Sequence, residues 1–132
     1  MKNNNILNLL ATILLISFCS TALAQHSGVK RIDLQKHDLN ISGQEVIQAK
    51  IDFQPGAAFG FHCHPGEEII YVLQGTLEYQ FEGEKPVTLQ AGEVLFVPAG
   101  IYHSAKNTGT NTASELATYV VAKGKQLITI RQ

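Results

Sequence analysis

The sequence has few cysteines, no excess of charge of either sign and, beyond its first residues, no long apolar run. Only two cysteines occur in 132 residues. Ten Lys and Arg residues are balanced by eleven Asp and Glu residues, so the formal net charge of −1 gives no electrostatic attraction to nucleic acid or anionic lipid. No later segment is apolar enough to span a membrane. We therefore expect neither a nucleic-acid partner nor a membrane partner for the body of the chain.

The first 24 residues carry the pattern of a secretory signal peptide. Lys2 supplies a positive start, residues 6–18 are mostly apolar and uncharged, and residues 22–24 read Ala-Leu-Ala, a small-x-small cleavage site. An uncleaved membrane anchor is the alternative, but polar residues interrupt the apolar run and leave it short for a span. We expect cleavage after Ala24 and a periplasmic or secreted protein.

The remaining residues, 25–132, are long enough for one domain with one core. Residues 25–30 show no clear pattern and are expected to form a loose N-terminal arm. Cys19 would leave with the signal peptide, so Cys63 would be alone and no internal disulfide could form even in an oxidising compartment.

Short apolar strands separated by turns dominate the rest of the chain. Residues 47–53 alternate apolar and polar side chains, and residues 77–81 repeat this period of two, which is typical of half-buried strands. Pro-Gly sequences at 55–56 and 65–66 mark turns between strands. Strands of this length at such regular spacing predict an all-β sandwich or barrel.

Three histidines and one glutamate are candidate metal ligands. His62 and His64 lie two residues apart on a predicted strand, so their side chains project from one face, about 7 Å apart at the backbone. Glu68 follows the next turn and can reach the same point, whereas His103 comes from a distant segment. Three imidazoles and one carboxylate suit Mn, Fe, Co, Ni, Cu or Zn, and the set lacks the thiolates of a closed structural zinc site. Octahedral coordination would leave two positions open for chemistry.

The surrounding residues make this set far more specific than an isolated His-x-His. Residues 56–75 follow the spacing G-x5-H-x-H-x3-E-x6-G, and residues 92–107 follow G-x5-P-x-G-x2-H-x3-N. With both motifs in order, the chain resembles the cupin superfamily, and its wider sequence resembles small single-domain bacterial cupins with a conserved barrel. The resemblance implies a jelly-roll β-barrel of six to eight strands, often dimeric, in which His62, His64, Glu68 and His103 bind a divalent metal.

Other polar residues near the motifs are assigned less specific roles. Cys63 faces away from its two histidine neighbours if the strand is regular, which leaves a buried apolar role, a reactive thiol or a cross-chain disulfide open. Glu67 points the opposite way from Glu68 and is expected to be a solvated surface carboxylate. His26 and His37 lie away from the motifs and are expected at the surface.

The predicted interior is apolar and aromatic apart from the metal ligands. Positions in phase with the ligands, and further candidates for the lining, are Ala58, Gly60, Ile70, Val72, Leu77, Tyr79, Phe81, Phe96 and Tyr119. Most Lys and Arg residues fall in turns, on outward phases or near the ends, so no cation cluster is expected to hold a phosphate or sugar acid. This composition favours a small neutral or aromatic ligand, or dioxygen.

Two classes of function fit these residues. The first is a metal-dependent enzyme, with a dioxygenase-like reaction preferred, in which Glu68 could leave the metal and act as a catalytic base. A metal-dependent lyase or isomerase is equally compatible with the residues. The second is a non-catalytic module that binds or senses a metal or small ligand. The preference for an enzyme rests on fold analogy alone, because the site offers no Ser-His or Cys-His nucleophile pair.

Overall fold

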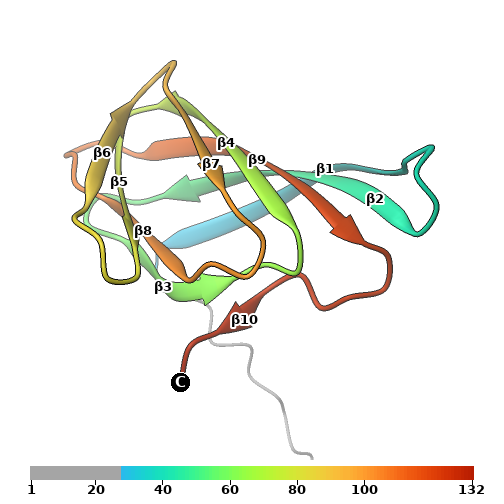
Figure 1. The fold of residues 1–132 in the computed structure, drawn as a ribbon. Helices are drawn as coiled ribbons and strands as arrows, with labels where there is room; N and C mark the ends of the chain where they lie inside the picture. Colours follow the sequence, from blue (N-terminus) through green and yellow to red (C-terminus); the bar gives the residue numbers. More distant parts are fainter. Residues whose placement is uncertain (1–27) are drawn as a thin grey trace, which may run out of the picture.

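The computed structural model describes residues 28–132, which form ten strands joined by turns. They build two five-stranded antiparallel sheets that face each other (Figure 1). The first sheet has the order β1 (Val29–Asp38), β2 (Gln44–Phe53), β9 (Ala113–Ala122), β4 (Glu67–Gln74) and β7 (Val94–Val97). The second has the order β10 (Thr129–Ile130), β3 (Ala58–Cys63), β8 (His103–Asn107), β5 (Thr76–Phe81) and β6 (Val87–Gln90). The predicted all-β jelly-roll architecture is confirmed.

The predicted signal peptide, residues 1–24, lies outside the described residues. The prediction of a loose arm over residues 25–30 is wrong for Val29 and Lys30. In the structure Val29 pairs with Phe53 and Lys30 with Asp52, at the start of the β1–β2 ladder. Strand β1 escaped sequence analysis because most of its side chains are exposed and its apolar residues do not alternate. No helix in the described part of the chain is long and apolar enough to cross a membrane.

The period-two patterns become strands whose alternate side chains fill the space between the sheets. In β2, Ala49, Ile51 and Phe53 are buried, and in β5, Leu77 and Tyr79 are fully buried. Each of the larger side chains contributes roughly 1.5–3 kcal/mol to folding by leaving water. A continuous apolar core between the two sheets therefore holds them together.

The Asn107 side chain and the motif glycines shape the turns at the ends of the motif strands. Asn107 at the end of β8 is fully buried, and its side-chain amide donates to the carbonyl oxygens of Phe53 and Asn111. Its side-chain oxygen accepts from the backbone N–H of Gly109 at 2.8 Å. The Asn107 side chain therefore ties together the backbone of the adjoining loops. The four motif glycines, at 56, 75, 92 and 100, all have positive φ, as their turn positions require.

Candidate metal centre

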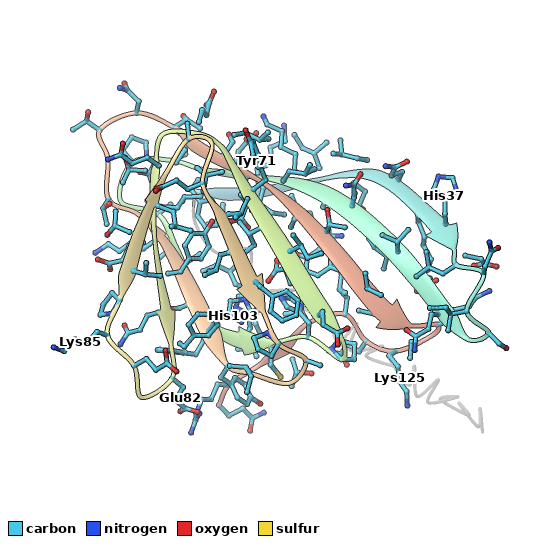
Figure 2. All side chains as sticks on the ribbon, turned by 45° about the horizontal axis from the view of Figure 1, so that its top comes forward. His37, Tyr71, Glu82, Lys85, His103 and Lys125 are labelled. Carbon is cyan, nitrogen blue, oxygen red and sulfur yellow. The ribbon has the colours of Figure 1, made fainter. Side chains whose placement is uncertain are left out.

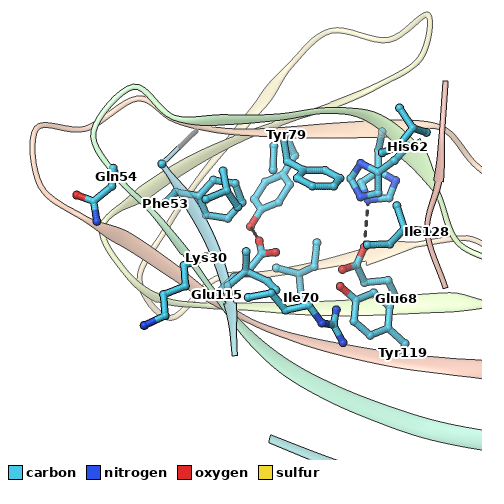
Figure 3. A pocket seen from close by; sticks show the side chains of 18 of the residues that line it. Lys30, Phe53, Gln54, His62, Glu68, Ile70, Tyr79, Glu115, Tyr119 and Ile128 are labelled. Atoms are coloured by element: carbon cyan, nitrogen blue, oxygen red, sulfur yellow. Dashed lines mark hydrogen bonds and ion pairs between the residues drawn. The ribbon is translucent and has the colours of Figure 1, made fainter. Parts of the chain in front are cut away.

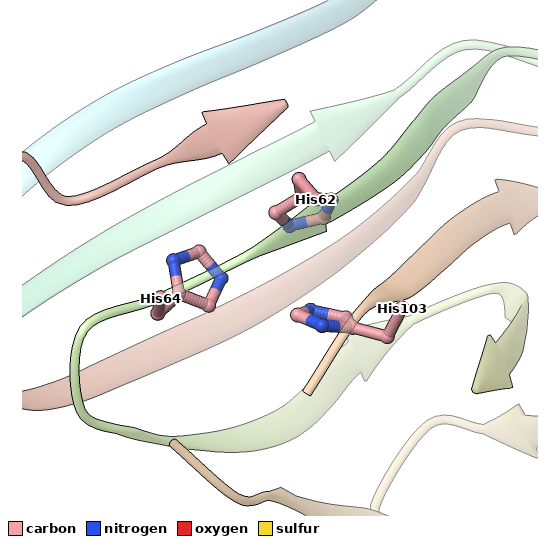
Figure 4. Close-up of side chains that lie close together, drawn as sticks. All are labelled: His62, His64 and His103. Carbon is pink, nitrogen blue, oxygen red and sulfur yellow. The ribbon is translucent and has the colours of Figure 1, made fainter. Parts of the chain in front are cut away.

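The side chains of His62, His64 and His103 converge between the two sheets (Figure 4). One ligand atom from each lies within 4.8 Å of the others, and all three residues are buried. His62 is near the end of β3 and pairs directly with His103 at the start of β8, whereas His64 follows β3. Segments 40 residues apart in the sequence thus become neighbours because β3 and β8 are adjacent strands of one sheet.

Each of the three imidazoles is oriented by a backbone carbonyl. Nδ1 of His62 lies 2.8 Å from the oxygen of Gly60, and Nδ1 of His64 lies 2.8 Å from that of Leu127. Nδ1 of His103 lies 3.1 Å from the oxygen of Ile101. A carbonyl only accepts, so Nδ1 of each ring carries a proton, and in the neutral form of a ring the lone pair of Nε2 is available to a metal. This is the arrangement in which imidazoles bind metals through Nε2.

Glu68 enters the same space from β4 in the opposite sheet. Its Oε2 lies 3.1 Å from Nε2 of His103 and 3.2 Å from Nε2 of His64. Burial by itself raises the pKa of Glu68, but interactions with His103 and His64 outweigh it and lower the pKa to about 2. The structure therefore brings together all four residues that the motifs single out.

Electrostatics hold these groups in the protonation states that metal ligands need. Burial, followed by repulsion from His103, lowers the pKa of His62 to about 4, so this ring is neutral at physiological pH. The Glu68 carboxyl is ionised under the same conditions. Metal binding requires neutral imidazoles and a deprotonated carboxylate, so no proton need be removed from either group first.

A buried nitrogen in this cluster lacks a hydrogen bond. Nε2 of His64 is shielded from solvent and, despite its short distance to Glu68, makes no hydrogen bond of acceptable geometry. Buried polar atoms are almost always paired, so an unpaired lone pair beside two other imidazoles and a carboxylate fits a metal ligand. The donor set of three nitrogens and one oxygen suits a divalent transition metal.

The cluster opens into a cavity of about 1180 Å³ between the sheets (Figure 3). Its wall includes His62, Glu68 and His103, together with the predicted lining residues Ile70, Tyr79 and Tyr119. A molecule inside this cavity would therefore contact the imidazoles of His62 and His103 and the Glu68 carboxylate directly.

The lining differs from the prediction at several positions. Phe59 lines the cavity in place of Ala58 and Gly60, because the β3–β8 register shifts between Phe59 and His62 and puts these two residues on one face. The Phe59 ring packs edge-on against His62, with the ring centroids 4.5 Å apart. Phe96 is 56% exposed on the outer face, opposite to the prediction. Val72, Leu77 and Phe81 do not belong to the cavity wall.

Charged residues that sequence analysis missed also line the cavity. Glu115, Arg31 and Lys30 all contribute to its wall, so the expectation of a lining without further charge is wrong. Glu115 is 5% exposed and accepts a hydrogen bond from the Tyr79 hydroxyl. The alternation of β9 could have revealed it, because Glu115 is in phase with Tyr119. Arg31 had no such signal, because β1 itself was missed.

The remaining polar residues lie away from the cluster. Glu67 and His37 are exposed, as predicted, and His37 projects from the outer edge of the first sheet while His103 points inward (Figure 2). Cys63 is half-buried and free, and its thiol contacts the Tyr102 hydroxyl. His26 lies outside the described residues.

Two facing antiparallel sheets with a buried histidine cluster between them define a jelly-roll protein of the metal-binding type. The chain belongs to the cupin superfamily, since the family model described as Cupin domain matches residues 49–124. It is 40% identical over 79 residues to germin-like protein subfamily 2 member 2 of Arabidopsis thaliana, covering 56% of this chain and 36% of that protein.

An oxalate-binding protein of Thermotoga maritima is 38% identical over 74 residues, covering 55% of this chain and 60% of that protein. A solved structure of oxalate oxidase superposes with a TM-score of 0.64 and 25% identity, covering 81% of this chain and 57% of that one. The chain thus spans between about a third and three fifths of the curated relatives it matches.

Proposed function

We propose that His62, His64, Glu68 and His103 bind a divalent transition metal, and that a small molecule binds the metal from the cavity. The observation that carries this proposal is the orientation of the three imidazoles. Backbone carbonyls hold all three Nδ1 atoms, which leaves every Nε2 facing the point that Glu68 also reaches. Such preorganisation costs no rearrangement when the ion arrives.

The chemistry we propose is that of an oxygenase acting on a small organic compound. A divalent ion in this site would supply Lewis-acid or redox chemistry at the coordination positions that face the cavity. The side chain of Glu68 is then placed to accept a proton from a bound molecule, with the Tyr119 hydroxyl hydrogen-bonded to the carboxylate. The likeness to oxalate oxidase supports an oxidative reaction.

A second candidate function is binding without turnover. The likeness to an oxalate-binding protein favours it, because the match covers 60% of that relative's length but only 36% of the germin-like protein's length. Both candidates use the same four ligands and the same cavity. They differ only in whether the bound molecule reacts.

The ligand assignment is tested by metal analysis of the protein recovered from its own compartment. We expect about one metal ion per chain in the natural protein, and loss of that ion when His62→Ala and Glu68→Ala are combined. His37→Ala is the control, because it removes an exposed imidazole from the same fold. Stoichiometric metal in the folded double variant would show that the ligands are misassigned.

Dioxygen consumption separates the enzyme from the binding module. The metal-loaded protein is mixed with oxalate or with a small aromatic acid, and dissolved dioxygen is followed with an electrode. Uptake that depends on substrate and disappears in Glu68→Gln supports the oxygenase. Tight binding of the same compounds by calorimetry, with no uptake, supports the binding module instead.

We also propose that the chain is exported, cleaved after Ala24, and that residues 25–132 form one domain. The charge, apolar run and small residues of the first 24 positions support this proposal. The test is the mass of the protein collected outside the cytoplasm. A chain beginning at Gln25 is expected, and an intact N-terminus in that fraction would contradict it.

A further inference from the structure

Arg31 reaches the cavity from β1, outside both sequence motifs. Its Nε lies 2.7 Å from the carboxylate of Asp33, which is 79% exposed and sits at the solvent edge. Its Nη1 is shielded from solvent and has no hydrogen-bond partner. A guanidinium nitrogen that is buried and unpaired is costly, so a ligand atom that accepts a hydrogen bond from it would remove this cost.

The register of the first sheet explains how Arg31 reaches the interior. Arg31 pairs with Ile51, which pairs with Glu115, so these three residues form one row across β1, β2 and β9. The next inward-facing row contains Ala49 beside Ala117, whose small side chains leave room for the guanidinium. Arg31 can therefore extend along the inner face of the sheet toward the metal centre.

The Tyr119 ring packs against both Arg31 and His64. Cζ of Arg31 is 5.5 Å from the centroid of this ring, and the His64 ring is 4.8 Å from the same centroid. The guanidinium and the His64 ring can be no farther apart than these two distances combined. A small organic acid of a few carbon atoms can therefore reach from the guanidinium to the centre.

The charges of the cavity favour an anionic ligand. A divalent ion with one ionised carboxylate, Glu68, would leave one positive charge at the centre. Arg31 and Lys30 add positive charge to the wall, and the exposed Asp33 carboxylate beside Arg31 offsets only part of it. Burial raises the pKa of Glu115 to about 8, so this carboxyl adds little negative charge at neutral pH. The wall between the two positive regions is mostly apolar, with Ile51 and Ile70 facing a carbon skeleton.

We propose that Arg31 anchors the carboxylate of a small organic acid whose other end reaches the centre formed by His62, His64, Glu68 and His103. This inference rests on the proposed metal site and adds the class of ligand and a specificity-determining residue to it. A guanidinium donates to a carboxylate with matched planar geometry, which a neutral group cannot replace. The ligand is therefore a small organic acid, and its carboxylate end lies toward β1.

The test measures binding of linear dicarboxylates of two to six carbon atoms, and of their half-amides, to the zinc-loaded protein by calorimetry. We expect the acid that binds most tightly to bind more tightly than its half-amide. Arg31→Gln should weaken binding of that acid about tenfold to a hundredfold and abolish the preference over the half-amide. Arg31→Lys keeps the charge and should retain part of both.

Lys36→Gln is the matched control, because it removes one positive charge from the same strand at a residue outside the cavity wall. An equal loss in Lys36→Gln and Arg31→Gln would overturn the proposal, since the loss would then be a general effect of charge on binding. Equal binding of acids and half-amides would also overturn it. Metal content is measured in the same samples. Wild-type protein without metal would refute the proposed function, whereas full metal content without dependence on Arg31 would refute only the anchor.

Discussion

Glu68 and Glu115 are two carboxyl groups in one cavity with opposite charge states. Interactions with His103 and His64 lower the pKa of Glu68 to about 2 despite its burial. Burial, reinforced by repulsion from Glu68, raises the pKa of Glu115 to about 8, although the hydrogen bond from Tyr79 opposes this rise. One carboxyl is thus ready to bind a cation, and the other remains a proton donor at neutral pH.

The raised pKa of Glu115 predicts a stability that falls as pH rises. The unfolded carboxyl loses its proton near pH 4.5 and the folded one near pH 8, so the folded state holds more protons between these values. Glu115→Gln removes this penalty and can still accept the hydrogen bond from Tyr79. We expect the variant to gain about 2–5 kcal/mol relative to wild type between pH 5 and pH 8.

Urea unfolding of the metal-free proteins at both pH values measures this change. Comparing variant with wild type cancels the contribution of His62, whose lowered pKa makes both proteins more stable as pH rises from about 4 to 6.5. The same pH dependence in the two proteins would contradict the assignment of a protonated, buried Glu115.

Two local features of the strands decide how the ligands are presented. The register shift in β3 turns Phe59 and His62 to the same face, which places an aromatic ring against the first ligand. The turn at Pro65 and Gly66 then reverses the chain between His64 and Glu68, so that these two ligands face each other from opposite sheets. A change in either feature would shift one ligand relative to the other three.

Gly66 is the position where this turn is most tightly packed. A Cβ at Gly66 would lie 2.1 Å from the carbonyl oxygen of Val120 and 2.9 Å from Cα of Val121, both of them backbone atoms of β9. Gly66→Ala is therefore expected to lower the free energy of unfolding by about 3 kcal/mol and to weaken metal binding by displacing His64 or Glu68. Denaturant unfolding and metal titration measure the two effects.

Pro65→Ala is the control for this substitution, because Pro65 is exposed in the same turn. It is expected to change the free energy of unfolding by less than about 1 kcal/mol. If Gly66→Ala were equally harmless, the close approach of the turn to β9 would not constrain the site.

In the whole molecule, the metal site connects the two sheets. His62 and His103 come from the second sheet and Glu68 from the first, so an ion would link facing strands of the two sheets. Its ligands are distributed over segments that are brought together only by folding. The ion is therefore expected to bind the folded chain far more tightly than the unfolded chain.

Adding zinc to the metal-free protein should raise its melting temperature. An excess of about 100 times the dissociation constant stabilises the folded state by about 2.7 kcal/mol, which corresponds to a shift of roughly 10 °C for a domain of this size. The shift is measured by calorimetry and should disappear with a chelator. The combined His62→Ala and Glu68→Ala variant should show no shift, and an equal shift there would place the binding site elsewhere.

The sequence by itself determined the architecture and the four members of the cluster. Strand periodicity depends only on the alternation of neighbouring side chains, and this local signal is strong in β2 and β5. The two motifs combine ligand residues with turn glycines at fixed spacing, so His62, His64, Glu68 and His103 could be named without coordinates.

Only the tertiary structure decided what surrounds the cluster. Phe59 enters the cavity through a register shift that no alternation pattern predicts. Phe96 lies on the outer face because it pairs with Ile69, whose side chain also points outward. Arg31 meets Tyr119 because β1 and β2 pair with β9, a strand that is distant from both in sequence. Contacts across strands depend on register and sheet order, which short-range sequence patterns do not encode.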